Sequence, residues 1–108
     1  MPEILAFNVS ELPKYGFKAV ELGGRSVLVG RIENRVFAYL DRCPHAGVPL
    51  RIGKLKGEEL TCGRHGWIFN LVTGHSVPDN PEFHLVEFSV RIEDSKIWVT
   101  LPDENNVL

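Results

Sequence analysis

The stretches CPHAG (43–47) and CGRHGW (62–67) contain the only two cysteines in this chain of 108 residues. In each stretch a histidine follows the cysteine, after one intervening residue in the first and after two in the second. Thiolates and imidazoles together are typical ligands of zinc and of iron in proteins. The sequence therefore predicts two loops that hold one metal centre between them. The candidate ligands are Cys43, His45, Cys62 and His65.

Short segments rich in β-branched and aromatic residues surround these loops and alternate with turn sequences, which is typical of antiparallel strands. One stretch, VSELPKYG (9–16), is helix-like, and Pro13 and Gly16 limit it to about a single turn. We therefore predict an all-β domain. The expected strands are 17–22, 26–32, 36–40, 58–62, 67–70, 83–90 and 96–101. The expected tight turns are LGGR (22–25), IENR (32–35) and EDS (93–95).

The segment of about 41–78 contains both cysteine stretches together with many glycines and prolines. We predict a single domain over 1–108, in which this segment is a small β subdomain that carries the metal centre at its tip. The base of the domain is expected to be an antiparallel β-sandwich, formed by 1–40 and 79–108.

Composition and charge argue against several classes of function. A net charge of −2 with 24% charged residues does not favour a nucleic-acid partner. No apolar run approaches the roughly 20 residues of a membrane span, and the N-terminal sequence has no basic stretch followed by an apolar one. We therefore expect a cytoplasmic protein, in which two cysteines more often bind a metal than form a disulfide.

Two kinds of metal centre are compatible with two thiolates and two imidazoles. Zinc accepts four such ligands, but its common sites pair cysteine with cysteine and histidine with histidine along the chain. A [2Fe–2S] cluster with mixed ligands binds both thiolates to one iron and both imidazoles to the other. Because each loop supplies one ligand of each kind, both loops can reach both irons, and this favours the cluster.

The stretches CPHAG, CGRHGWIF and TGHSVP together resemble the Rieske ferredoxins, whose pattern is C-x-H, then about fifteen to seventeen residues, then C-x-x-H-G. Sixteen residues separate His45 from Cys62. The resemblance extends over nearly the whole chain and implies the Rieske fold with one [2Fe–2S] cluster. It implies that Cys43 and Cys62 bind the inner iron. His45 and His65 would bind the outer iron, and Pro78 would belong to a third loop that covers the cluster.

This resemblance also implies a function. Rieske ferredoxins carry single electrons from a flavin-dependent, NAD(P)H-oxidising reductase to a terminal oxygenase, which is either an aromatic-ring dioxygenase or a di-iron monooxygenase. The chain has no glycine-rich dinucleotide motif and no mononuclear iron motif of two histidines and a carboxylate. We therefore expect an electron carrier rather than an enzyme, monomeric and docking only transiently with its partners.

Positions 67 and 69, which follow the second histidine, are relevant to the reduction potential. Membrane-complex Rieske proteins have hydroxyl-bearing residues there, directed at a sulfide and at a cysteine sulfur, where this chain has Trp67 and Phe69. Hydrogen bonds to the sulfurs raise the potential. Their loss predicts a value near the low end of the Rieske range, about −150 mV.

Other interpretations remain open at this point. A zinc-binding structural or interaction module would use the same four ligands, and a regulatory redox or iron sensor would use the same cluster. The small subunit of nitrite reductases shares the fold usually without the ligands, all of which are present here. His75 and His84 fall at no ligand position, and we expect them to be ordinary turn and strand residues. Basic residues of the loop region form either a solvated face or a docking surface for an acidic partner: Arg42, Arg51, Lys54, Lys56 and Arg64.

Overall fold

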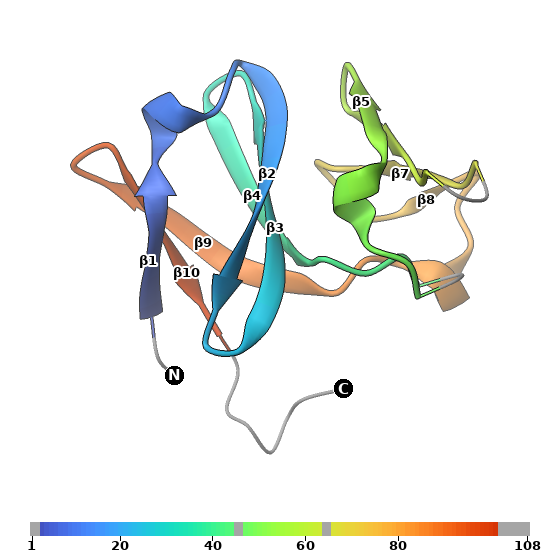
Figure 1. Cartoon of the computed structure of the whole chain (residues 1–108). Helices are drawn as coiled ribbons and strands as arrows, with labels where there is room; N and C mark the ends of the chain where they lie inside the picture. Colours follow the sequence, from blue (N-terminus) through green and yellow to red (C-terminus); the bar gives the residue numbers. More distant parts are fainter. Residues whose placement is uncertain (1–2, 45–46, 64–65, 102–108) are drawn as a thin grey trace.

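The computed structural model describes residues 3–44, 47–63 and 66–101 and contains two antiparallel sheets (Figure 1). The larger sheet has six strands in the order β1-β10-β9-β4-β3-β2, and the smaller has four in the order β5-β6-β7-β8. The strands of the larger sheet are β1 (Glu3–Asn8), β2 (Tyr15–Leu22), β3 (Arg25–Ile32), β4 (Arg35–Leu40), β9 (Glu87–Glu93) and β10 (Lys96–Thr100). Those of the smaller are β5 (Lys54–Lys56), β6 (Glu59–Thr61), β7 (Ile68–Asn70) and β8 (Ser76–Val77). The prediction of an all-β fold is confirmed.

Short 3-10 turns are the only helical segments among the described residues: η1 (Val9–Glu11), η2 (Leu50–Ile52) and η3 (Pro81–Phe83). Within the part of the chain that the structure describes, no helix has the length and apolar character needed to cross a membrane.

The larger sheet consists of two three-stranded halves, β1-β10-β9 and β4-β3-β2, which join through the pairs Ala38↔Phe88 and Tyr39↔Glu87 of β4 and β9. A first hydrophobic core fills the space that these halves enclose. Its fully buried members include Val27 of β3 and Val99 of β10. We call this larger sheet the base of the molecule. The small sheet lies next to it (Figure 1).

Strand β3 is buried on both faces. Val27 and Val29 belong to the first core, whereas Leu28 between them belongs to a second core that the base shares with the small sheet. Successive side chains of a strand point to opposite faces, so one strand contributes to both cores. The buried members of this second core are Leu28, Tyr39, Cys43, Leu50, Leu60, Cys62, Phe69, Leu71 and Leu85.

The tight turns lie where the sequence predicts them. Gly23 and Gly24 join β2 to β3 with φ of +58° and +82°, a conformation that glycine adopts without a steric cost. Asp94 and Ser95 join β9 to β10 with φ of +54° and +65°. These primed-type turns match the twist of the strands that they connect.

Several elements differ from the sequence-based expectation. The strand expected at 83–90 begins only at Glu87, because Pro81 and the Asn80 side chain, which accepts a hydrogen bond from Glu82 N, start η3 just before it. Strands β1, β5 and β8 were not expected. β5 and β8 have three and two residues, too few to show a period. β1 is a strand because it pairs with β10, with a shift of register between Leu5 and Phe7.

Candidate metal centre

Cys43 and Cys62 lie at corresponding places in the fold. Cys43 follows the end of β4 and Cys62 follows the end of β6. Their exposed fractions are 0% and 1%, and both thiols belong to the second core. The structure thus brings the two cysteines of the sequence motif into one buried region between the base and the small sheet.

The backbone around each cysteine is closed in the same way. Cys43 N donates to Val48 O at 2.7 Å, and Gly47 N donates back to Cys43 O at 2.7 Å. In the second loop, Cys62 N donates to Trp67 O at 2.6 Å, and Gly66 N donates back to Cys62 O at 3.2 Å. The two loops therefore share one hydrogen-bond pattern, with equal spacing along the chain.

The two predicted histidine ligands, His45 and His65, lie outside the described residues. In sequence each stands between a cysteine and the glycine that closes its loop. The structure places the two cysteines in one buried core, and the assignment of all four residues as metal ligands stays a prediction.

Asp41 anchors the first loop to the rest of the molecule. Its side chain is fully buried and accepts hydrogen bonds from Ser26 Oγ at 2.8 Å and from Arg51 N at 2.9 Å. The Arg51 guanidinium adds an ion pair at 2.5 Å. A buried carboxylate is stable only when it is paired and hydrogen-bonded. Asp41 meets that condition by joining β3 to η2 at a point two residues before Cys43.

Tyr39 makes a second connection between base and small sheet. Its buried hydroxyl donates to Leu71 O at 2.6 Å, and burial raises the pKa of the phenol above its ordinary value. The bond joins β4 to the residue that follows β7, and Leu71 itself packs in the second core.

Two glycines allow η2 and the second loop to pass close together. A Cβ at Gly53 would lie 2.2 Å from Thr61 O, and one at Gly63 would lie 2.7 Å from Ile52 O. No side chain fits at such distances from a backbone oxygen. Glycine is therefore required at both positions, because η2 and the second loop lie in close contact there.

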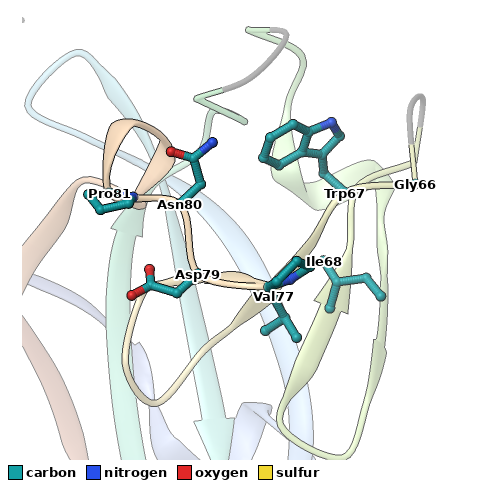
Figure 2. Close-up of a pocket in the computed structure, with 8 residues that line it drawn as sticks. Gly66, Trp67, Ile68, Val77, Asp79, Asn80 and Pro81 are labelled. Atoms are coloured by element: carbon teal, nitrogen blue, oxygen red, sulfur yellow. The ribbon is translucent and has the colours of Figure 1, made fainter.

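A pocket of 570 Å³ lies beside the second loop (Figure 2). Gly66, Trp67 and Ile68 form one wall, and the residues from Val77 to Pro81 form the other. The Trp67 ring is half-buried and packs edge-on against Phe83 at a centroid distance of 5.0 Å. Pro78, predicted to lie in a third loop over the metal centre, thus lies across a pocket from the second loop.

The structure also shows one cluster of side chains that the sequence does not predict. His75 and His84 were expected to be ordinary turn and strand residues, but their rings stack at 3.8 Å, and both face Asp79. His84 also ends η3 instead of lying in a strand. Nothing in the sequence indicates this contact, since it depends on how the segment 75–84 folds back on itself.

The donor set fits an iron–sulfur cluster. Two buried thiols within one apolar core provide ligands that are shielded from water. The loops that carry them are closed by the same two backbone hydrogen bonds at equal spacing. A zinc finger of the common kind would instead have both cysteines in one loop.

Comparison with known proteins gives the class. A family model described as the Rieske [2Fe-2S] domain matches residues 3–89. The chain therefore belongs to the Rieske [2Fe–2S] domain family, and one Rieske-type [2Fe–2S] cluster is the cofactor that this membership implies.

Individual relatives fall into two groups. The chain is 35% identical over 98 residues to apoptosis-inducing factor 3 of Homo sapiens and 33% identical over 103 residues to oxidoreductase NdmD of Pseudomonas putida. These matches cover 90% and 87% of this chain but only 16% and 18% of those proteins. The chain thus spans less than a fifth of the length of these curated relatives.

The second group has the size of this chain. The ferredoxin component of the naphthalene 1,2-dioxygenase system of Pseudomonas aeruginosa is 23% identical, over 89% of this chain and 92% of that protein. The solved ferredoxin of carbazole 1,9a-dioxygenase from Nocardioides aromaticivorans IC177 is 24% identical, with a TM-score of 0.80 over 92% of this chain and 97% of that chain. This likeness confirms the fold.

Proposed function

We propose that the chain is a Rieske ferredoxin that carries single electrons from a flavin-dependent, NAD(P)H-oxidising reductase to a terminal oxygenase. The observation that carries the proposal is the pair of matched loops, each closed by the same two backbone hydrogen bonds around a buried cysteine. Family membership and the match to ferredoxin components over nearly their whole length support it.

The ligand assignment is part of the proposal. Cys43 and Cys62, which are buried, would bind the inner iron, and His45 and His65 would bind the outer iron. When bound, the cluster supplies a one-electron couple. The chain's own residues hold it: the second core keeps water from the thiolates, and Asp41 fixes the start of the first loop.

The surface near the second loop suits brief contact with a partner. Ile52 and Val77 are 49% and 40% exposed, and both lie close to this loop. Lys54 and Lys56 are exposed on β5 beside it. Exposed apolar side chains near the loop and exposed lysines on β5 fit a small, transient interface with an acidic partner.

The remaining parts of the proposal follow from a carrier role. The chain would be a monomer in the cytoplasm and not itself an enzyme. Its base would comprise 1–40 and 79–108, with the cluster-binding subdomain at about 41–78. One solved relative indicates the kind of partner: a structure 25% identical over 90% of this chain is described as a complex of reduced oxygenase and oxidized ferredoxin in carbazole 1,9a-dioxygenase.

One observation favours a second candidate. The identity to apoptosis-inducing factor 3 and to NdmD is higher than that to the separate ferredoxin component of the naphthalene system. In those longer proteins the matching segment is only one part. The same domain could therefore pass electrons to a fixed neighbour in a larger oxidoreductase.

The first experiment determines the metal and its ligands. Protein purified without air is assayed for iron, sulfide and zinc, and its EPR spectrum is recorded after dithionite reduction. We expect two irons, two sulfides and a rhombic signal with a low average g. His45→Gln and His65→Gln should abolish that signal, whereas the matched control His75→Gln should keep it. One zinc without sulfide would overturn the proposal, as would a ligand variant with an unchanged spectrum.

The second experiment tests the carrier role. Chemically reduced protein is mixed in a stopped-flow instrument with an aromatic-ring dioxygenase or with a di-iron monooxygenase, and reoxidation is followed optically. A ferredoxin should reduce one of them at a rate that rises with oxygenase concentration and falls with added salt. Slow, concentration-independent oxidation by both would favour a sensor or a domain with a fixed neighbour.

A further inference from the structure

The segment 75–84 brings together three side chains that the electron-transfer role does not use. The Nε2 atom of His84 lies 2.8 Å from Asp79 Oδ1, and the Nδ1 atom of His75 lies 3.7 Å from the same oxygen. The two imidazole rings stack with their centroids 3.8 Å apart and their planes 6° from parallel. The three potential ligand atoms all lie within 4.8 Å of one another.

These distances suit a metal ion. In a tetrahedral site with bonds of about 2.0–2.1 Å, neighbouring ligand atoms are about 3.3–3.4 Å apart. The two distances to Asp79 Oδ1, 2.8 and 3.7 Å, lie on either side of that value. The shorter one is a hydrogen bond between Asp79 and His84, which the ion would replace. Two imidazoles and one carboxylate are a donor set that suits zinc, nickel, copper(II) and cobalt(II).

The three groups are accessible to an ion. The side chains of His75, Asp79 and His84 are 49%, 57% and 33% exposed. Water can therefore complete the coordination shell, as in sites with three protein ligands. The stacked rings need to rotate so that their lone pairs converge, and exposed side chains change rotamer readily.

The backbone holds the three positions in place before an ion arrives. Leu85 N donates to Gly74 O at 2.8 Å, which joins the two ends of the segment. Within it, Asn80 N donates to Ser76 Oγ at 2.8 Å, and that hydroxyl donates to Pro78 O at 3.1 Å. Fixing the ligand positions in advance lowers the entropic cost of binding.

We propose that His75, Asp79 and His84 form a second metal site, which takes one divalent transition-metal ion such as Zn²⁺ and is separate from the iron–sulfur centre. None of these residues is among the four cluster ligands. The ion links the residue before β8 to the residue that ends η3. Asp79 also lines the pocket opposite Trp67, so the ion fixes the wall that faces the second loop.

Zinc binding to the intact, tag-free protein tests the proposal. Holo-protein is titrated with Zn²⁺ by isothermal calorimetry, and zinc and iron are counted after gel filtration. We expect one zinc per chain with the iron content and the visible spectrum unchanged. Asp79→Asn and His84→Gln should each weaken zinc binding about tenfold or more, and Asp79→Glu should restore most of it.

The matched control is Glu82→Gln, which removes an exposed carboxylate from the same segment and should leave the zinc affinity unchanged. The visible spectrum of each variant reports whether it has folded, and His75→Gln replaces any variant that has not. The proposal is overturned if no stoichiometric zinc binds, if zinc affinity survives in the folded ligand variants, or if zinc enters only as iron is lost. Iron and sulfide content is measured separately, so failure here leaves the proposed electron-transfer function standing.

Discussion

Gly47 and Gly66 occupy the same position in two different loops. Each lies four residues after a cysteine, donates its N–H to that cysteine's carbonyl oxygen, and has a left-handed φ, of +72° and +70°. Other residues reach this region only at a steric cost. The two glycines therefore set the shape of the paired loops from which the proposed centre is built.

Replacing Gly66 by alanine tests whether its left-handed conformation supports the second loop in particular or only the stability of the whole fold. A Cβ there meets no atom of the described residues within 4 Å, so Gly66→Ala should cost only the conformational penalty, about 1 kcal/mol. Because the strain lies in the second loop, we also expect faster loss of iron on warming. Gly57→Ala is the matched control, since Gly57 has φ of +60° and equally open surroundings outside the cysteine loops. Equal iron-loss rates in the two variants would contradict the assignment.

Asp41 should matter more than an exposed carboxylate. Asp41→Ala removes the common acceptor of Ser26 and Arg51, which are half-buried and exposed, at a cost of about 2 kcal/mol in the free energy of unfolding. Chemical denaturation measures the loss. Glu11→Gln, which removes a surface ion pair with Lys18, should have little effect. Comparable losses in the two variants would show that the Asp41 network contributes no more than a surface pair.

Tyr39 should make the fold sensitive to alkaline pH. Burial raises its pKa above the ordinary value of 10.0, so above pH 10 the unfolded chain loses this proton while the folded chain keeps it. The stabilisation is fully present below pH 10 and declines as pH rises, by at most about 1.4 kcal/mol per pH unit. Denaturation between pH 9 and 11 should show a shallower decline in Tyr39→Phe. The hydrogen bond to Glu33 also raises the pKa of Tyr15, but this site is exposed and screened by solvent, so Tyr15→Phe should change the slope less.

The reduction potential should depend on residue 69. Phe69 is fully buried in the core that contains both cysteines and has no hydroxyl to donate toward sulfur. Phe69→Tyr should raise the potential, because hydrogen bonds to cluster sulfurs favour the reduced state. Redox titration followed by EPR measures the change. Phe83→Tyr, at a ring that packs against Trp67 but is not part of the second core, should leave the potential unchanged. A fall in potential in Phe69→Tyr would contradict the idea.

Replacing Gly53 by alanine tests the close contact between η2 and the segment that leads into the second loop. Gly53→Ala would place a Cβ 2.2 Å from Thr61 O, so the backbone has to move. We expect a loss of at least about 2 kcal/mol, as for overpacked cores, together with lower iron content after purification. Gly24→Ala, at a turn with no atom near its Cβ, should retain full iron content. Normal iron in Gly53→Ala would show that this contact does not support the loop.

Local patterns in the sequence predict the cysteine loops well because their determinants are local. Cysteine spacing and closing glycines lie within a few residues, and the strands around them alternate regularly. Strands β5 and β8 are too short for a period to appear, and β1 depends on β10, which lies far away in sequence. The stacking of His75 on His84 depends on the fold of a whole loop. For His45 and His65 the sequence motif remains the argument, since they lie outside the described residues.

The burial of β3 on both faces has a mechanical consequence. Leu28 packs beneath the cysteine loops while its neighbours Val27 and Val29 pack inside the base, so the tip cannot swing on a hinge without disturbing the strand that holds the base together. Amide protons of the two cores should then exchange with solvent in one cooperative opening. Within the described residues, the two sheets should therefore move as one body rather than about a hinge between them.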